Sequence, residues 1–236
     1  MSQDIASPIT APRFSVRSAV REATGFLELP RLALGLRSLR GEPRGDGSRV
    51  IVLPGFGADD RSTWPLRRFL RSLGHDARGW RRGPNTGDVA RSVERVGEMV
   101  RAGADETGRP VSLVGWSLGG YLAREVARDH PDRVRQVVTL GSPVIGGPKY
   151  TTVASVAPLR GWDLDEIESL VEERKRVPLA VPVMAIYSRR DNVVAWRACV
   201  DPEGGGPIEH VEVEATHIGL GFSPDVYRLL ARRLAA

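Results

Sequence analysis

The sequence contains a single cysteine, Cys199, among its 236 residues. One cysteine cannot close an internal disulfide, and it excludes a zinc site built from cysteines. A free cysteine is usually a small residue of the core, and we interpret Cys199 in that way. We predict no metal site and no cofactor for this chain.

Lysine is also scarce, because only Lys149 and Lys175 stand among the 34 lysine and arginine residues. The formal net charge of +5 would suit a partner such as nucleic acid or an anionic membrane. However, the arginines are spread along the whole chain and mixed with acidic residues, which is typical of a solvated surface. We therefore expect no nucleic-acid partner.

Long apolar runs are absent as well. The first residues, Met1–Ile5, lack the basic and apolar regions of a secretory signal. The apolar stretch 177–187 is short and is interrupted by Pro178 and Pro182, so it is not expected to cross a bilayer. These features favour a cytoplasmic protein.

Residues 14–40 have the spacing of amphipathic helices, with apolar side chains set among arginine and glutamate. Pro30 should break or kink this stretch, so we predict two short helices. The glycine-rich stretch 41–47 is typical of a linker. The sequence therefore predicts a helical appendage over residues 1–45 and a main domain over residues 46–236. The appendage either packs on the main domain or a second subunit, or binds a partner or a membrane surface.

Short apolar segments alternate with amphipathic segments throughout the main domain. This alternation is typical of an α/β fold, a doubly wound and mostly parallel sheet with helices on both faces. The predicted strands are 50–53, 76–80, 111–114, 134–140, 182–187 and 209–214. The predicted helices are 62–72, 88–104, 118–129 and 226–234. Region 143–181, with one predicted helix over 163–176, is expected to form a short lid.

The pattern Gly-x-Ser-x-Gly occurs at residues 115–119. In a glycine-rich chain these five residues alone are close to chance, but here a predicted strand leads into them and a predicted helix follows. Gly115 and Gly119 would avoid side-chain collisions in the sharp turn, so that Ser117 projects its hydroxyl at the positive end of the helix. We predict Ser117 as a nucleophile. Trp116 is interpreted as packing beneath the turn, with a substrate contact as the alternative.

The stretch Leu113–Gly120, Leu-Val-Gly-Trp-Ser-Leu-Gly-Gly, resembles the nucleophile elbow of bacterial lipases and esterases of the α/β-hydrolase superfamily. The resemblance covers residues from about 50 to 234 and leaves the N-terminal segment out. It implies the α/β-hydrolase fold, acyl-ester chemistry and a catalytic triad in the chain order serine, acid, histidine.

This order implies a general base near the C-terminal end of the chain. His217 follows the last predicted strand, at the edge where such sheets form their sites, and we predict it as the base, with His210 as the alternative. Asp191 follows the preceding predicted strand in a segment that resembles the acid loop of the family, and it would orient His217. Asp163 and Asp165 are the alternative acids, and a turn-capping role is the alternative for Asp191.

An oxyanion hole requires two backbone donors. The first predicted donor is the N–H of Leu118, directly after Ser117. By its position in the family the second is the N–H of Phe56, after the first predicted strand. Lipases often carry His-Gly in that loop, whereas this chain has Pro54-Gly55. The departure leaves an amide donor available, and an ordinary strand-ending turn is the alternative.

These residues predict a serine hydrolase that cleaves carboxylic esters through an acyl-enzyme. The partner would be a small-molecule ester, and the length of the lid region indicates an apolar acyl group. Acyl transfer and the hydrolysis of amides or lactones would use the same residues. A second class of function is a membrane-surface or partner-binding module, because residues 14–40 are basic and amphipathic. Peripheral membrane contact or a homodimer would then form through them.

Overall fold

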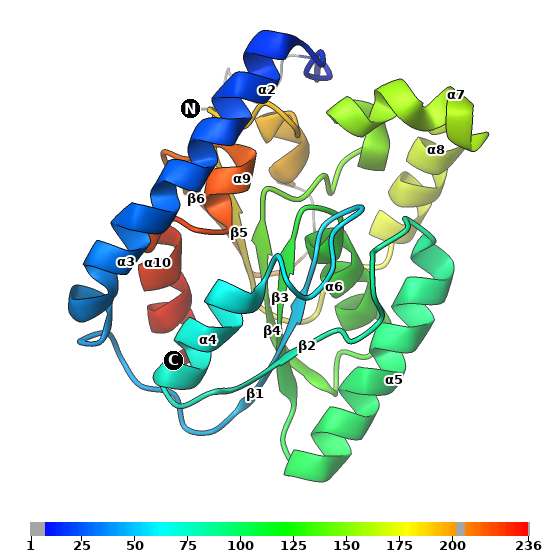
Figure 1. The fold of residues 1–236 in the computed structure, drawn as a ribbon. Helices are drawn as coiled ribbons and strands as arrows, with labels where there is room; N and C mark the ends of the chain where they lie inside the picture. Colours follow the sequence, from blue (N-terminus) through cyan, green and yellow to red (C-terminus); the bar gives the residue numbers. More distant parts are fainter. Residues whose placement is uncertain (1–7, 202–205, 236) are drawn as a thin grey trace.

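A parallel sheet of six strands forms the centre of the computed structural model, which describes residues 8–201 and 206–235. The strands lie in the order β2-β1-β3-β4-β5-β6 (Figure 1). Their bounds are β1 Arg49–Leu53, β2 Asp76–Gly79, β3 Val111–Trp116, β4 Val134–Leu140, β5 Val183–Tyr187 and β6 Ile208–Glu212. All neighbouring strands are parallel, and each lies within two residues of its predicted bounds. The predicted α/β sheet is therefore confirmed.

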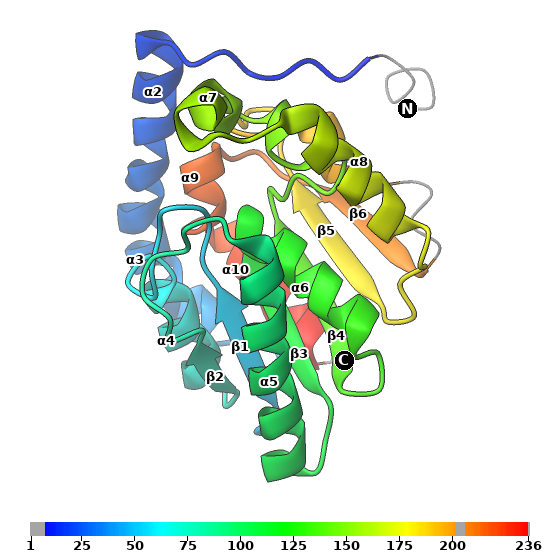
Figure 2. The ribbon, with the colours of Figure 1, turned by 90° about the vertical axis from the view of Figure 1, so that its right-hand side faces the viewer.

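Helices pack on both faces of the sheet, as predicted (Figures 1 and 2). Helices α3, α4 and α10 cover one face, whereas α5 and α6 cover the other. Their bounds are α3 Glu28–Leu39, α4 Trp64–Ser72, α5 Val89–Thr107, α6 Leu118–Asp129 and α10 Pro224–Ala235. Successive residues of β1 point to opposite faces, so Val50 and Val52 join the first core and Ile51 and Leu53 the second. The central strands are thus buried on both sides, which explains their unbroken apolar sequences.

The N-terminal segment forms two helices, as predicted, but the interruption is not at Pro30. Helix α2 (Val16–Ala23) is followed by a 3-10 turn, η1 (Thr24–Leu27), and then by α3. Pro30 is the third residue of α3, where a backbone N–H has no acceptor within the helix, so proline is tolerated. Residues 1–7 of the predicted appendage lie outside the described residues.

The rest of this segment packs on the main domain. Leu32 and Leu39 of α3 are buried in the core that also contains α10. The carboxylate of Glu42 binds Arg228 at 3.1 Å and Arg232 at 2.9 Å, and both arginines belong to α10. Apolar burial and ion pairs therefore both join the segment to the C-terminal helix.

Region 143–181 folds into short helical turns and one longer helix over the carboxyl end of the sheet. The bounds are η2 Gly147–Tyr150, η3 Thr152–Val156, α7 Ala157–Arg160 and α8 Leu164–Lys175. The predicted helix over 163–176 corresponds to α8. Asp163 begins it by accepting the backbone N–H groups of Asp165 and Glu166 at 3.0 and 3.1 Å.

No helix among the described residues combines the length and the apolar character that a bilayer span requires. Cys199 ends a further 3-10 turn, η4 (Trp196–Cys199), and is buried, as predicted. Burial raises the pKa of its thiol, which disfavours the reactive thiolate.

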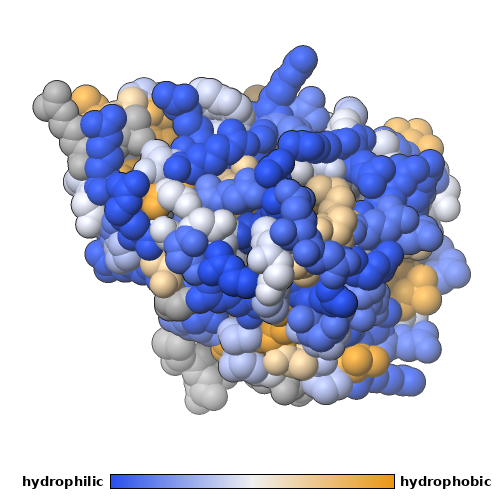
Figure 3. Space-filling model, turned by 90° about the horizontal axis from the view of Figure 1, so that it is seen from below, coloured by the Kyte–Doolittle hydropathy of each residue, from blue (hydrophilic) through white to orange (hydrophobic). Residues whose placement is uncertain are grey.

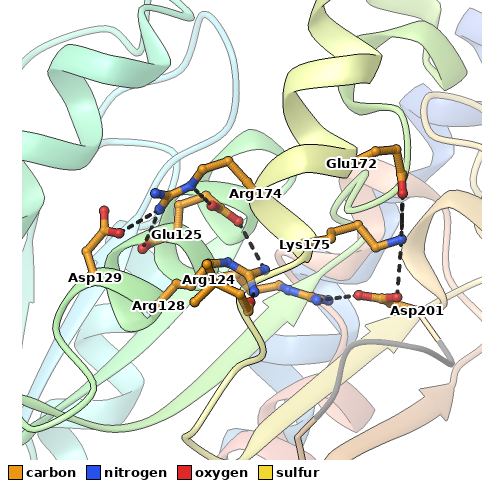
Figure 4. A network of polar contacts seen from close by, with 9 residues as sticks. Arg124, Glu125, Arg128, Asp129, Glu172, Arg174, Lys175 and Asp201 are labelled. Atoms are coloured by element: carbon orange, nitrogen blue, oxygen red, sulfur yellow. Dashed lines mark hydrogen bonds and ion pairs between the residues drawn. The ribbon is translucent and has the colours of Figure 1, made fainter.

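A partly buried group of ion pairs joins α8 to α6 (Figure 4). Arg124 of α6 pairs with Asp201 at 2.5 Å, and the two side chains are 1% and 0% exposed. Lys175, at the end of α8, lies 3.6 Å from the same aspartate. Its neighbour Arg174 binds Glu125 of α6 at 2.7 Å. The C-terminal end of α8 is therefore attached to α6 by charged contacts.

Asp201→Ala is expected to lower the free energy of unfolding by about 3–5 kcal/mol, because it leaves the buried charge of Arg124 without its closest partner. Equilibrium unfolding in urea measures this difference. The control is Asp225→Ala, which removes a largely exposed carboxylate paired with Arg228 and should cost at most about 1 kcal/mol. Equal losses in the two variants would contradict the importance of the buried pair.

Candidate active site

Ser117 occupies the turn between β3 and α6 with a φ of 55° and a ψ of −124°. A positive φ is strained for a residue with a side chain, and Arg81 is the one other non-glycine example among the described residues. The N–H of Ser117 donates to the carbonyl of Leu140 in β4 at 2.8 Å, and α6 begins at the next residue. The strand-turn-helix arrangement predicted from the glycine pattern is therefore present.

The glycines of this turn are required by close backbone contacts. A Cβ on Gly115 would overlap the carbonyl of Gly119, and a Cβ on Gly119 would overlap the carbonyl of Leu53 in β1. A Cβ on Gly120 would overlap the hydroxyl of Ser142. The expected collisions thus involve mainly the backbone around the turn, and a side chain at any of these positions would push the turn away from the sheet.

Asp191 and His217 form a hydrogen-bonded pair at the carboxyl ends of β5 and β6. The Asp191 Oδ2 atom lies 2.6 Å from His217 Nδ1, and the side chains are 1% and 8% exposed. The other carboxylate oxygen of Asp191 accepts the backbone N–H groups of Val193 and Val194 at 2.8 and 2.7 Å. His217 begins a short helix, α9 (His217–Leu220). Asp191 is thus oriented by its own loop, and its carboxylate orients the imidazole of His217.

The surroundings of His217 favour its protonated form. Burial lowers the pKa of the imidazole, but the charge of Asp191, the hydrogen bond to Asp191 and the charge of Glu22 together raise the pKa above its ordinary value. A histidine with a raised pKa is a stronger base, so it accepts a proton more readily from a neighbouring donor.

Ser117 is linked to this pair through its neighbours. The indole N–H of Trp116 donates to the backbone carbonyl of His217 at 3.2 Å, and the two rings lie 6.1 Å apart. A Cβ on Gly141 would lie 3.0 Å from Asp191 Oδ2 and 3.1 Å from His217 Nδ1. Among the described residues, no hydrogen bond joins the Ser117 hydroxyl to His217. The structure therefore joins the predicted acid to the predicted base, and it places Ser117 next to a residue that contacts that base.

The two predicted oxyanion donors belong to two loops that adjoin Ser117. Leu118 is the first residue of α6, so its N–H has no acceptor within the helix. In the other loop, a Cβ on Gly55 would lie 3.2 Å from the Ser117 Cβ and 3.8 Å from its Oγ, and Phe56 follows directly. The buried side chain of Asn85 donates to the carbonyl of the residue before Gly55 at 3.0 Å and so holds this loop beside the turn.

Ser117, Leu118 and Phe56 line one cavity of about 250 Å³. Region 143–181 contributes an apolar wall to it, formed by Val153, Trp162, Ile167, Leu170 and Val171. None of the described residues that line this cavity carries a charge, and His217 is not among them. The rings of Phe56 and Trp162 meet edge to face at 5.7 Å, and the guanidinium of Arg160 covers both. The space in front of Ser117 is therefore suited to an apolar group.

A family model described as the alpha/beta hydrolase family matches residues 50–235. The chain belongs to the alpha/beta hydrolase family. The resemblance seen in the elbow sequence is thereby confirmed for most of the chain. The match does not include α2 and α3, which precede residue 50.

Curated relatives of this α/β hydrolase align with a smaller part of it. The chain is 31% identical over 103 residues to a pimeloyl-acyl-carrier protein methyl ester esterase of Aeromonas hydrophila, an alignment that covers 42% of this chain and 39% of that protein. It is 28% identical over 129 residues to the protein of the same name from Aliivibrio salmonicida, with 53% and 44% covered. The chain thus spans about two fifths of the length of these curated relatives.

Solved structures with the same fold include two lipases. A lipase of Bacillus licheniformis superposes with a TM-score of 0.64 at 14% identity, over 83% of this chain and 95% of that one. A monoacylglycerol lipase of Paleococcus ferrophilus gives a TM-score of 0.59 at 16% identity, over 82% and 96%. At such identities the likeness concerns the fold alone.

The alternative base and acids lie elsewhere in this α/β hydrolase. His210 is in β6, where its Nε2 accepts the N–H of Asp201 at 3.0 Å, and burial lowers the pKa of its ring. Asp163 caps α8, and Asp165 pairs with Lys149 at 2.5 Å. None of the three alternatives lines the cavity in front of Ser117.

Glu22 of α2 contacts the loops of both the predicted acid and the predicted base, and this contact was not predicted from the sequence. Its buried carboxylate accepts backbone N–H groups of Asn192 and Ile218, which directly follow the predicted acid and base. These partners are 170 and 196 residues away in the chain. No local pattern signals such a contact, because it arises from the packing of α2 on α9.

Proposed function

We propose that this α/β hydrolase cleaves carboxylic esters, with Ser117 as the nucleophile, His217 as the general base and Asp191 as the acid that orients it. The observation that carries the proposal is the positive φ of Ser117 at the wall of an apolar cavity, one residue away from a contact with the Asp191–His217 pair. The names of the curated relatives support an ester as the substrate class, since those proteins are methyl ester esterases.

In the first half of the reaction, Nε2 of His217 takes the proton of the Ser117 hydroxyl while that oxygen attacks the ester carbonyl. The electron pair of the carbonyl moves onto its oxygen, which accepts hydrogen bonds from the N–H groups of Phe56 and Leu118. The charge of Asp191 stabilises the imidazolium formed at this stage. When the tetrahedral intermediate collapses, the C–O bond to the alcohol breaks, and His217 gives its proton to the departing alkoxide.

In the second half, His217 takes a proton from water, and the resulting hydroxide adds to the acyl group on Ser117. The Ser117 oxygen then leaves and recovers its proton from His217, which releases the carboxylic acid. Acyl transfer, amide cleavage and lactone opening would differ only in the acceptor or in the bond that breaks, and the same residues would serve them.

We further propose that the acyl group of the substrate is apolar. The cavity walls contributed by Phe56, by Trp162 and by the inner side of α8 carry no charged side chain that could bind a polar or charged acyl chain. Val171 is an inner residue of α8 and is 4% exposed, so its size affects the depth of the cavity.

Ser117→Ala is expected to abolish labelling by a fluorophosphonate probe and to reduce ester turnover by at least about 1,000-fold, because the nucleophile is lost. Gel fluorescence and initial rates on p-nitrophenyl butyrate measure both effects. Ser155→Ala, a change at an exposed serine of η3 outside the cavity, is the matched control and should behave as wild type. Equal labelling of Ser117→Ala and wild type would reject Ser117 as the nucleophile.

A series of p-nitrophenyl esters with acyl chains from two to about sixteen carbons tests the acyl pocket. We expect kcat/KM to rise with chain length at first, by up to about 4-fold for each methylene that becomes buried. Val171→Phe should move the optimum to shorter chains because it fills the cavity. Leu159→Phe, at a residue of α7 that is 87% exposed, should leave the optimum in place. Activity that only declines from two carbons upwards would contradict an apolar acyl pocket.

We also infer a second property, binding of the exposed face of residues 14–34 to an anionic membrane surface. Most of the large apolar side chains that are exposed in the described structure belong to this segment: Phe14, Val16, Val20, Phe26, Leu27, Leu29 and Leu34. Exposed arginines stand among them: Arg13, Arg17, Arg21 and Arg31. The lower end of the molecule, in contrast, is largely hydrophilic (Figure 3). An apolar face edged by arginine suits a headgroup layer, whereas two copies of it would bring arginines together in a homodimer.

Val20→Glu is expected to weaken binding to anionic vesicles by roughly 10-fold. The change removes apolar area that the membrane would bury, and it adds a negative charge that the anionic lipids repel. Co-sedimentation of the full chain with phosphatidylcholine vesicles, with and without phosphatidylglycerol, measures the bound fraction. Leu159→Glu serves as the control because it changes an exposed apolar residue outside the segment. Unchanged binding by Val20→Glu would refute the membrane surface. A dimer seen by light scattering that Val20→Glu dissociates would assign the face to self-association.

A further inference from the structure

The carboxylate of Glu22 connects the two loops that carry the proposed acid and base. Its Oε1 atom accepts the backbone N–H of Asn192 at 2.8 Å and the side-chain amide of the same residue at 3.0 Å. Its Oε2 atom accepts the backbone N–H of Ile218 at 3.0 Å. Asn192 directly follows Asp191, and Ile218 directly follows His217. Both oxygens of one buried side chain are therefore committed to the backbone of the site.

The N-terminal segment lies close enough to α9 to hold Glu22 in this position. A Cβ on Gly25, in η1, would lie only 2.5 Å from the backbone nitrogen of Gly219 and 3.0 Å from the Cβ of Ile218. Figure 1 shows α2 running beside α9. Glu22 itself is 6% exposed, so its three hydrogen bonds form away from competing water.

We propose that Glu22 is a positioning residue of the active site, and that the N-terminal segment before the family match is therefore part of that site. The inference rests on the proposed roles of Asp191 and His217. By binding the amides of Asn192 and Ile218 with one side chain, Glu22 fixes the acid loop and the start of α9 relative to each other. That restraint maintains the 2.6 Å contact between Asp191 Oδ2 and His217 Nδ1.

Glu22 also acts on His217 through its charge. Burial lowers the pKa of His217, and the charges of Asp191 and Glu22, with the Asp191 hydrogen bond, outweigh that effect. One further charged group near α9 is Glu28 of α3, whose Cγ lies 3.6 Å from a Cβ on Gly219 and whose carboxylate is bound to Arg31 at 2.7 Å. Removing the charge of Glu22 should lower the pKa of His217. Because a histidine acts as a base only when neutral, the acid limb of the activity profile should then move to lower pH.

Glu22→Gln is the decisive variant because it keeps the shape of the side chain. A carboxamide offers one oxygen acceptor and one NH₂ donor, so one of the N–H groups of Asn192 or Ile218 would face a donor in either orientation. The matched control is Glu42→Gln. Glu42 attaches the same N-terminal segment to Arg228 and Arg232 of α10, and the charges that act on the pKa of His217 are those of Asp191 and Glu22.

The experiment compares the full-length wild type, Glu22→Gln and Glu42→Gln. NMR titration of the imidazole gives the pKa of His217, and p-nitrophenyl butyrate gives kcat, KM and the pH profile. For Glu22→Gln we expect the pKa of His217 to fall by roughly half a unit or more. We expect kcat to fall about 10-fold with KM changed less than about 2-fold, because the reacting groups are misaligned while the acyl pocket is intact. Glu42→Gln should leave both the pKa and kcat as in wild type.

Unchanged pKa and kcat in Glu22→Gln would overturn the inference. Equal changes in Glu42→Gln would also overturn it, because the attachment of the N-terminal segment, and not Glu22 itself, would then explain the changes in pKa and kcat. If Glu22→Gln does not fold, Glu22→Asp keeps the charge on a shorter side chain, and an unchanged kcat in that variant rejects the positioning role. Failure of the proposed function is recognised separately, as absence of turnover and of fluorophosphonate labelling in wild type. In that case the NMR titration still decides whether Glu22 acts on His217.

Discussion

The close approach of backbone segments at the Ser117 turn is the constraint on which the site depends. β1 supplies the Leu53 carbonyl that leaves no room for a side chain on Gly119, and β4 supplies the Leu140 carbonyl that binds the Ser117 N–H. The turn is thus held between neighbouring strands of a buried parallel sheet. Strain at one residue with a positive φ costs on the order of 1–3 kcal/mol, and it persists only where surrounding contacts fix the backbone in that conformation.

His217 is held by its backbone as much as by its ring. The ring is bound to Asp191, the carbonyl of His217 accepts the Trp116 indole, and the amide of Ile218 is bound to Glu22. These partners come from three distant parts of the chain. If His217 is the base, as proposed, a ring held from several directions needs little rearrangement when it accepts a proton, which is the preorganisation that electrostatic stabilisation in an enzyme requires.

Helix α6 and strand β4 were predicted best, because their signals are local, whereas β3 ends two residues later than predicted. The bounds of α6 and β4 agree with the predicted segments, because α6 directly follows the glycine turn and β4 is a short, mostly apolar segment between two polar turns. The predicted break at Pro30 was misplaced, because a helix tolerates proline in its first turn. Glu22 could not have been identified, since an isolated glutamate on an amphipathic helix is typical of a solvated face. Its burial follows from the packing of α2 on α9, and no local rule contains that information.

The family match begins at residue 50, but Glu22, which precedes it, is hydrogen-bonded to Asn192 and Ile218 within the matched region. A fragment that started at residue 50 would keep Ser117, Asp191 and His217, but the amides of Asn192 and Ile218 would lose their acceptor. Each such donor costs about 1–3 kcal/mol if it stays buried, so the fragment would relax at the place where the proposed acid and base meet. The family match and the proposed active site therefore cover different lengths of the same chain.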